Sequence, residues 1–278
     1  MALDIDGTLL QYDGSMDDEV RDAVRAVADA GHHVVIATGR SILGAASVIE
    51  MLSLTDGFAV TSNGAVTARL HGTGWEIVDM VTFDATPVLR VLKDAWPDAV
   101  VGVEEPGVGT KVSAPFPEDE LVGPKRILPW DELGAEPTTR LTFRSPSGTA
   151  EDFVDLVDRL GLHGVNYAVG YTAWLDVNPE GVSKASALEQ VRRELHVEPA
   201  DTVAIGDHTN DLEMLRWAAR GVAMGQAPDE VKAVADEVTL PIDEAGAAVI
   251  LRQLTRGFVP HPRVETDTDG RPSAGPLV

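Results

Sequence analysis

Short apolar runs alternate with amphipathic stretches along the first part of the chain. Residues 17–30 carry apolar side chains at helical spacing, with acidic residues in the first turn, and this pattern predicts a helix. The apolar runs 33–37 and 58–60 predict strands, and residues 41–52 predict a second helix between them. Short apolar strands separated by amphipathic helices indicate a parallel sheet that is covered on both faces.

The pattern changes in the middle of the chain and then returns. Between residues 79 and 179 the sequence predicts a mixture of strands and helices, with prolines in the loops: strands at 100–103, 140–143 and 173–177, and helices near 86–95 and 149–160. After Gly181 the first pattern is found again: a helix at 183–195, a strand at 202–205, a helix from Asp211, a strand at 221–223, and helices near 228–235 and 243–254.

This order of elements predicts an α/β protein in two parts. We expect a Rossmann-like parallel-sheet core formed by residues 1–80 and 180–256, and an α+β cap domain inserted at 81–179. The stretch 257–278 is rich in proline and poor in large apolar residues, so it is expected to be disordered. Few residues precede Asp4, so we expect the first strand to be very short.

Composition narrows the classes of partner. The formal charge is −23 over 278 residues, and such a surface repels nucleic acid and anionic membranes. No apolar stretch approaches the ~20 residues that span a bilayer. The chain has no cysteine, so disulfides and thiolate metal sites are excluded, which fits a cytoplasmic location. A small anionic substrate would have to be attracted by local positive groups. The oligomeric state is left open.

The first candidate site is the sequence Asp4-Ile5-Asp6-Gly7-Thr8, at the end of the first apolar run. Carboxylate oxygens suit a hard divalent cation such as Mg²⁺, and a carboxylate beside such a cation can attack phosphorus. A calcium-binding EF-hand loop is excluded, because its glycine and glutamate positions hold Leu9 and Ser15. On its own, the motif is also compatible with an ordinary acidic turn.

Three further polar clusters follow apolar strands or begin helices, where ligands of open α/β sheets bind. Thr38 and Gly39 offer a hydroxyl and a backbone N–H to an anion, although a capped turn explains them equally well. Lys184 stands near a predicted helix start, where an anionic partner would offset the helix dipole. The segment 206–211 is either a helix cap or a second set of oxygen ligands. Arg40 is expected to form a structural ion pair.

Taken in this order, the four motifs resemble those of the haloacid dehalogenase (HAD) superfamily, in its Cof-type branch with a large inserted cap. The resemblance covers nearly all of residues 1–254. It is carried by these stretches of sequence: ALDIDGTLL, VVIATGR, SNGA, NPEGVSKASAL, VAIGDHTNDLEML and GVAMGQAPDEVKAVADEV.

The resemblance implies a role for each matching position. Asp4 is expected to be the nucleophile that becomes an aspartyl phosphate, and Asp6 the general acid and base. Mg²⁺ would be held by Asp4, the backbone carbonyl of Asp6 and Asp207, with Asp211 in support. The phosphoryl oxygens would be bound by the following groups: Thr38, Lys184, Asn210, and the backbone N–H groups near Ile5 and Gly39. We therefore expect the side chains of Asp4, Asp6 and Asp207 to surround one magnesium pocket beneath the cap. The resemblance assigns no cap residue to the substrate.

These expectations lead to one main hypothesis and two alternatives. The main hypothesis is a Mg²⁺-dependent phosphohydrolase that cleaves phosphomonoesters of small metabolites, such as sugar phosphates or phosphorylated cofactors. A phosphotransferase or phosphomutase would use the same motifs, and phosphate release without an acceptor separates the two. A phospho-accepting sensor module without turnover is the third hypothesis. Receiver-like domains of this kind also use an aspartate at a strand end, but they lack the second aspartate two residues later and the large inserted cap.

Overall fold

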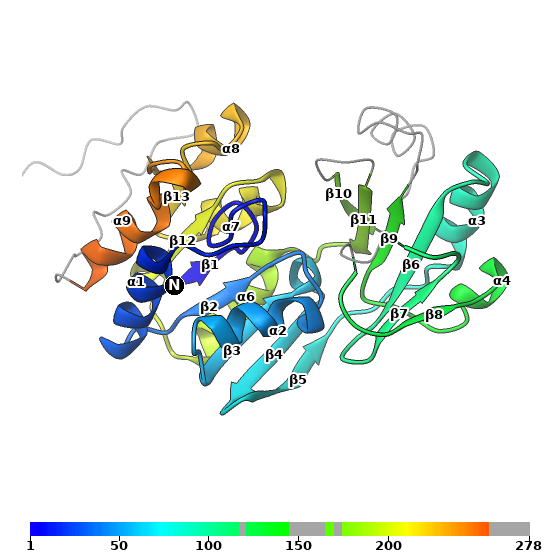
Figure 1. Cartoon of the computed structure of the whole chain (residues 1–278), viewed down its shortest axis with the longest axis horizontal. Coiled ribbons are helices and arrows are strands. Elements are labelled where there is room, and N and C mark those ends of the chain that lie inside the picture. The colour runs from blue at the N-terminus through cyan, green and yellow to red at the C-terminus, as the bar shows by residue number, and fades with distance from the viewer. Residues whose placement is uncertain (117–120, 145–164, 170–173, 256–278) are drawn as a thin grey trace, which may run out of the picture.

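The computed structural model describes residues 1–116, 121–144, 165–169 and 174–255. These residues form two sheets, which Figure 1 shows as two lobes. The predicted helix at 149–160 and the predicted disordered stretch 257–278 lie outside the described residues. The mixed α/β architecture confirms the fold class expected from the sequence.

The first sheet contains eight strands within the described residues, in the order β14-β13-β12-β1-β2-β3-β4-β5. Their bounds are Ala2–Leu3 (β1), Val35–Ala37 (β2), Asp56–Thr61 (β3), Val66–His71 (β4), Gly74–Met80 (β5), Val203–Gly206 (β12), Arg220–Ala223 (β13) and Glu237–Val238 (β14). The pairs from β14 to β3 are parallel, as predicted, whereas β3, β4 and β5 pair antiparallel.

Helices cover both faces of this sheet, because successive residues of each strand point to opposite sides. Leu3 and Ile36 pack into one core with α1, α2 and α9, while Ala2 and Val35 pack into a second core with α6, α7 and α8. The helix bounds are Asp18–Asp29 (α1), Ile42–Met51 (α2), Lys184–Glu194 (α6), Leu212–Trp217 (α7), Asp229–Val234 (α8) and Gly246–Leu254 (α9). Short 3₁₀ helices lie in the connections between elements of this lobe: Ser62–Gly64 (η1), Pro199–Asp201 (η2), Thr209–Asp211 (η3) and Ile242–Glu244 (η4).

Local capping fixes where the helices begin. The side chain of Asp17 accepts the N–H of Glu19 before α1, and that of Ser41 accepts the N–H of Gly44 before α2. Ser183 forms a capping box with Ser186, so α6 begins at Lys184. The helices predicted from apolar spacing at 17–30, 41–52 and 183–195 are confirmed, apart from shifts at their ends.

The antiparallel pair β4 and β5 extends the sheet beyond the predicted parallel strands. The turn between the two strands contains Gly72 with a positive φ of 60°. The outer strand β5 is mostly exposed, so its sequence lacks the continuous apolar run that identified the buried strands. Its edge position explains why the sequence did not predict it.

The second sheet has the strand order β10-β11-β9-β6-β7-β8. Its strands are Val100–Glu105 (β6), Gly109–Val112 (β7), Lys125–Ile127 (β8), Leu141–Arg144 (β9), Val165–Val169 (β10) and Trp174–Pro179 (β11), and its helices are Thr86–Ala95 (α3) and Trp130–Leu133 (α4). All of these elements lie between β5 and α6 in the sequence, which supports the predicted cap insertion. The boundaries near residues 80 and 180 stay a prediction.

The two faces of the second sheet differ in polarity. On one face, Val101, Leu141 and Val177 pack with α3 and Leu133 into an apolar core. The intervening residues of the same strands, and Arg140 just before β9, point to the opposite face. Several of these residues are polar and buried: Glu104, Arg140, Thr142, Asp176 and Asn178. Figure 1 shows α3 and α4 on the side away from the first sheet, so the polar face is directed toward it.

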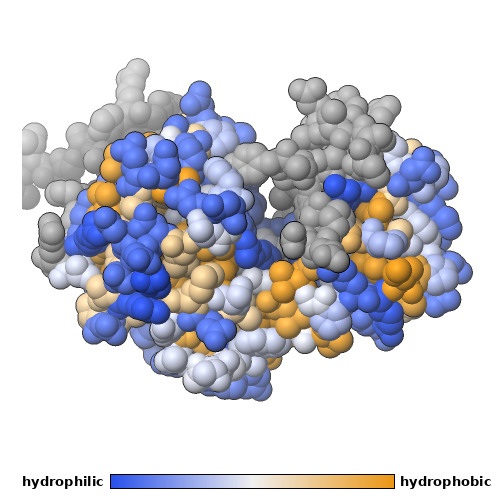
Figure 2. Space-filling model, in the orientation of Figure 1, coloured by the Kyte–Doolittle hydropathy of each residue, from blue (hydrophilic) through white to orange (hydrophobic). Residues whose placement is uncertain are grey.

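Hydrophilic residues dominate the visible surface of the first lobe, in keeping with the strong negative charge (Figure 2). In the described part of the chain, no helix combines the length and the apolar character needed to cross a bilayer.

Gly64 provides a test of how the first lobe is assembled, because it lies against the start of α6. Its φ is +101°, and a Cβ there would lie 2.1 Å from the carbonyl oxygen of Ser183. Gly72 also has a positive φ, but a Cβ there would meet nothing within 4 Å. Gly72→Ala is therefore expected to cost about 1 kcal/mol for the backbone alone. Gly64→Ala should cost an additional ~1 to 3 kcal/mol for the collision.

The measurement is urea unfolding of both variants beside the wild type. Equal losses of stability in the two variants would contradict the close approach of η1 to α6.

Candidate active site

Two of the predicted acidic clusters meet because their strands are neighbours. Asp4 follows β1 and Asp207 follows β12, and these strands pair in parallel with Leu3 opposite Ile205. Although β1 has only two residues, it lies between β12 and β2, and the N–H of Asp4 also donates to the carbonyl of Ile205. The carboxyl ends of parallel strands meet at one sheet edge, which brings both aspartates together.

Asp211 completes a buried group of three carboxylates. Each of Asp4, Asp207 and Asp211 offers an oxygen, and these oxygens lie within 4.8 Å of one another. Asp211 stands at the end of η3, and its Oδ2 accepts the backbone N–H groups of Asp207 and His208 at 2.9 and 3.1 Å. All three side chains are buried. The structure therefore groups three of the predicted metal ligands.

Lys184 lies inside this acidic group and is itself fully buried. Its Nζ donates to Asp4 Oδ1 and to Asp211 Oδ1, each at 2.7 Å. Burial alone lowers the pKa of a lysine, but the attraction of Asp211 and Asp4 outweighs it and raises the pKa of Lys184 above its ordinary value. The lysine is therefore charged, as its predicted role as an anion ligand requires.

One ammonium cannot neutralise three carboxylates. Burial raises the pKa of Asp4 well above its usual value, against the opposing attraction of Lys184. Burial and the neighbouring charge of Asp211 raise the pKa of Asp207 to about 7. The group thus has a deficit of positive charge that a proton or a cation can fill.

Several local features fit a divalent cation at this place. The buried Oδ1 of Asp207 has no hydrogen-bond partner among the described residues. Gly7 allows the carboxylate of Asp207 to come close to the first cluster, because a Cβ at Gly7 would lie 2.0 Å from Asp207 Oδ2. Oxygen ligands of this kind suit Mg²⁺. The residues present therefore fit the predicted metal.

Asp6 departs from the predicted geometry. Its side chain is 57% exposed and bound by Arg40, whose Nη2 and Nε lie 2.5 and 2.9 Å from the two carboxylate oxygens. The expectation that the side chains of Asp4, Asp6 and Asp207 share one pocket is thus corrected, because the metal-competent group contains Asp211 instead. The guanidinium fork matches both oxygens of Asp6 and holds them outside the cluster. Arg40 does form the ion pair predicted for it.

Two of the residues predicted to bind phosphoryl oxygens, Thr38 and Gly39, directly follow β2. Thr38 is buried, and its Oγ1 accepts the N–H of Arg40 at 3.1 Å. Asn210 donates from Nδ2 to Oδ1 of Asn63 at 3.0 Å, and the same Asn63 oxygen lies against Gly39. Asn63 therefore connects two of the predicted ligands, Gly39 and Asn210. Ile5 is also buried, at the first cluster.

Asn63 is a site residue whose role the sequence did not predict. It lies in η1 with a positive φ of 53°, and its N–H donates to the carbonyl of Thr38. Its Nδ2 also donates to Oδ1 of Asn178 at the end of β11. The sequence does contain a signal that points to Asn63, because Ser62-Asn63-Gly64 follows an apolar strand, as the other polar clusters do.

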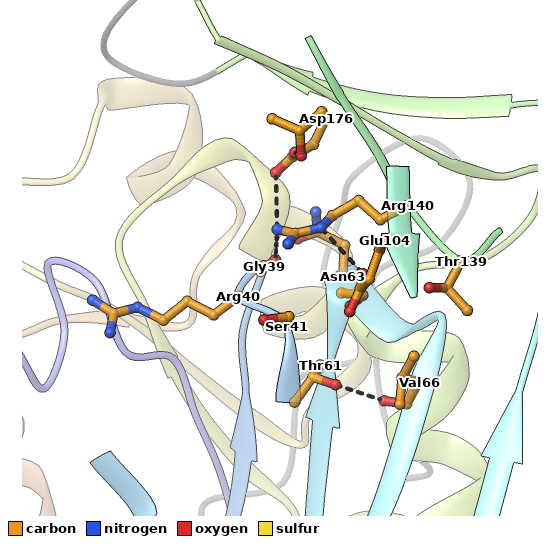
Figure 3. A network of polar contacts seen from close by, with 12 residues as sticks. Gly39, Arg40, Ser41, Thr61, Asn63, Val66, Glu104, Thr139, Arg140 and Asp176 are labelled. Atoms are coloured by element: carbon orange, nitrogen blue, oxygen red, sulfur yellow. Dashed lines mark hydrogen bonds and ion pairs between the residues drawn. The ribbon is translucent and has the colours of Figure 1, made fainter. Parts of the chain in front are cut away.

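The second lobe also contacts the loop after β2, where Thr38 and Gly39 are predicted to bind phosphate. Nη1 of Arg140 donates to the carbonyl of Gly39 at 2.7 Å, and Glu104 and Asp176 flank the same guanidinium (Figure 3). Ser62 donates to Oε2 of Glu104 at 2.7 Å. These contacts were missed because they join residues from separate strands, and no sequence spacing identifies them.

The buried acidic group should make the stability of the fold depend on pH. A bound metal ion should offset the loss of stability at high pH. The usual pKa of an aspartate is about 4, so the unfolded chain loses this proton at lower pH than folded Asp207 does. The folded state binds the proton more tightly, and the stability contributed by Asp207 falls as pH rises from about 4 to about 7. We expect Mg²⁺ to raise the melting temperature more at about pH 8 than at about pH 5.5, relative to protein in EDTA.

The control is a pair of variants. Asp207→Asn should lose most of the rise in melting temperature that Mg²⁺ causes, whereas Asp98→Asn, at an exposed position, should keep this rise. An equal Mg²⁺ shift at both pH values would contradict the assignment.

Comparisons with known proteins agree with this geometry. The family model for haloacid dehalogenase-like hydrolases matches residues 1–98 and 131–251. A 5-amino-6-(5-phospho-D-ribitylamino)uracil phosphatase of Bacillus subtilis is 28% identical, over 91% of this chain and 94% of its own. A phosphoglycolate phosphatase of Natronomonas pharaonis is 30% identical, over 86% and 90%. A solved sugar phosphatase of HAD subclass IIB superposes with a TM-score of 0.78 at 25% identity, over 91% and 97%. The chain therefore belongs to the haloacid dehalogenase-like hydrolases, in their Cof-type branch, and is a phosphatase.

Proposed function

We propose that the protein is a Mg²⁺-dependent phosphomonoesterase that acts on small metabolites, such as sugar phosphates or phosphorylated cofactors, through an aspartyl phosphate on Asp4. One observation carries this proposal: Asp4 is held by the buried ammonium of Lys184 inside a group of carboxylates that fits a divalent cation. A nucleophile fixed in this way does not have to be oriented at the moment of reaction.

The first step is attack by a carboxylate oxygen of Asp4 on phosphorus. A bond forms between this oxygen and phosphorus, while the bond from phosphorus to the leaving oxygen breaks. Lys184 bonds Asp4 Oδ1 and so restricts the rotation of the carboxylate. When bound by Asp4, Asp207 and Asp211, Mg²⁺ would supply positive charge to the phosphoryl oxygens.

The phosphoryl oxygens have donors at the end of β2. The Thr38 hydroxyl oxygen already accepts a backbone N–H, so its own hydrogen is available for a phosphoryl oxygen. The amide of Asn210, the ammonium of Lys184 and the N–H groups near Ile5 and Gly39 supply the other contacts. This arrangement neutralises the equatorial oxygens by hydrogen bonds and charge, as phosphoryl transfer requires.

Asp6 is proposed to protonate the leaving oxygen and later to activate water. Its exposed side chain has access to solvent, but Arg40 occupies both of its oxygens. Asp6 would therefore exchange Arg40 for the leaving group when substrate binds. The cap would lie over the leaving group and exclude bulk water.

The relatives support the size and type of substrate. Their names specify a phosphorylated ribitylaminouracil, phosphoglycolate and sugar phosphates, which are small phosphomonoesters. The negative charge of this chain and its lack of cysteine agree with a small metabolite in the cytoplasm as substrate.

The nucleophile is tested by Asp4→Asn. We expect a loss of about a thousandfold or more in kcat with p-nitrophenyl phosphate and Mg²⁺, because the amide does not attack phosphorus. Asp98→Asn makes the same chemical change at an exposed position and should keep wild-type activity. Release of inorganic phosphate without an acceptor is the readout that separates hydrolysis from phosphotransfer. Near wild-type turnover by Asp4→Asn would rule out the proposed nucleophile.

A further inference from the structure

A glutamine beyond the end of β13 contacts two of the loops that form the candidate metal site, and the proposed chemistry gives it no role. The strands β13, β12 and β1 are adjacent and parallel, so the residues that follow them meet at one edge of the sheet. Gln226 lies three residues after β13, Asp207 directly follows β12, and Gly7 lies in the loop after β1. Gln226 is half-buried.

The two ends of the Gln226 amide bind different partners. Its Nε2 donates to the carbonyl oxygen of Gly7 at 2.6 Å and to Oδ2 of Asp207 at 3.4 Å. Its Oε1 accepts the backbone N–H of Ile242, in η4, at 3.0 Å. Because Ile242 supplies a donor, the amide oxygen has to face η4, and both amide hydrogens are left for Gly7 and Asp207. Turning the amide over would place its oxygen against the carbonyl oxygen of Gly7.

The segment that contains η4 is itself fixed beside this loop. The N–H of Gly225 donates to the carbonyl of Leu240 at 3.2 Å. A Cβ at Gly225 would lie only 2.6 Å from the nitrogen of Pro241, so the two segments approach closely at this point. On its other side, the carbonyl of Ile242 accepts a hydrogen bond from Nε2 of Gln11 at 3.1 Å. The donor that sets the direction of the amide is therefore held in place.

The contact with Asp207 distinguishes the two oxygens of this metal ligand. Oδ2 is the oxygen nearer to Gly7, where a Cβ would lie 2.0 Å from it, and it accepts from Gln226. Oδ1 is buried and has no hydrogen-bond partner among the described residues. An amide that engages one oxygen opposes rotation of the carboxylate. The other oxygen of Asp207 is thereby kept unpaired and available to a metal ion.

The contact with Gly7 orients the peptide group that precedes it. The N–H of Gly7 donates to the carbonyl of Leu10 at 3.0 Å, and its own carbonyl accepts from Gln226. In a planar trans peptide the carbonyl points away from the N–H, so the carbonyl of Asp6 is directed away from Leu10. This carbonyl is one of the predicted Mg²⁺ ligands. Its direction depends on a glycine whose two polar groups are both bound.

A purely structural role explains only one end of the amide, since the bond to Ile242 satisfies a backbone donor. We propose that Gln226 is a positioning residue of the metal site. Through the carbonyl of Gly7 and Oδ2 of Asp207, it directs the Asp6 carbonyl and the Asp207 Oδ1 toward the cation. The inference rests on the proposed Mg²⁺-dependent function and adds to it a residue that acts through the metal ligands.

Removal of the amide tests this role. Gln226→Met keeps the length of the side chain but has no donor, and we expect the dissociation constant for Mg²⁺ to rise by about tenfold or more, as for other partners of metal ligands. The readout is the melting temperature during titration with Mg²⁺ in the absence of substrate. At saturating Mg²⁺, the KM for p-nitrophenyl phosphate should stay close to that of the wild type, because the phosphoryl donors are unchanged. An unchanged dissociation constant for Mg²⁺ would overturn the proposal.

A conservative variant identifies the amide as the responsible group. Gln226→Asn keeps an amide on a side chain that is one methylene shorter, so it should recover part of the affinity that Gln226→Met loses. Equal dissociation constants in these two variants would contradict a role for the amide. Should Gln226→Met fail to fold, as judged by its melting in EDTA, Gln226→Ala removes the amide without filling its space and gives the same readout.

A matched control separates positioning from a general loss of stability. Gln11→Met makes the same change at another half-buried glutamine, whose amide donates to the carbonyl of Ile242 instead. It should lower the melting temperature in EDTA and leave the dissociation constant for Mg²⁺ unchanged. A loss of Mg²⁺ affinity as large as that of Gln226→Met would show that any disturbance of η4 has this effect, and the proposal would fail.

The wild-type titration separates this inference from the proposed function. If Mg²⁺ binds the wild type and supports release of phosphate from p-nitrophenyl phosphate, while Gln226→Met binds Mg²⁺ equally well, the phosphomonoesterase proposal stands and the role of Gln226 fails. If Mg²⁺ neither raises the melting temperature of the wild type nor supports release of phosphate, the proposed function itself fails and the positioning role falls with it.

Discussion

The site depends on the two hydrogen bonds that the buried ammonium of Lys184 donates to aspartates. The ammonium joins three segments that are distant in sequence, because it bonds Asp4 after β1 and Asp211 at the start of α7 while lying at the start of α6. Without this cation, three carboxylates would be buried together, which is strongly unfavourable. With it, they still lack positive charge, and this deficit explains the fit to Mg²⁺. Burial, together with the charge of Asp211, raises the pKa of Asp207.

The same alternation of side chains that builds the cores also gives the second sheet its polar face. In the second sheet, the apolar residues of β6, β9 and β11 pack under α3, so their polar neighbours must face the first lobe. Asn178 extends this polar face, donating to the carbonyls of Ser62 and Thr139. A single rule of strand geometry thus links the stability of the second lobe to its contacts with the loop that contains Thr38 and Gly39.

Local sequence patterns predicted the elements of the first lobe and much of its site. Helices such as α1 and buried strands such as β2 have periodic apolar residues, and parallel strands bring the polar residues that follow them to one edge. This reasoning identified Asp4, Lys184, Asp207 and Asp211, which the structure groups as described. The catalytic roles of these residues stay predictions.

The remaining features depend on three-dimensional context. The side chain of Asp6 was expected in the metal pocket, but it forms an ion pair with Arg40 instead. The spacing of residues in the sequence does not show that Arg40 lies close enough to bind it. The positive φ of Asn63 and the meeting of Glu104 with Arg140 likewise arise from tertiary packing. The exposed strand β5 lacks a buried strand's apolar run, so its pairing was not predicted either.

The most direct test of the central claim is to trap the phosphorylated chain. An aryl leaving group needs little protonation, so Asp6→Asn should still be phosphorylated by p-nitrophenyl phosphate and should hydrolyse the acyl phosphate slowly. After acid quenching, mass spectrometry should find one phosphoryl group on the peptide that contains Asp4, and none in the double variant Asp4→Asn, Asp6→Asn. Turnover without any phosphorylated chain, or a phosphoryl group on a different residue, would contradict the account.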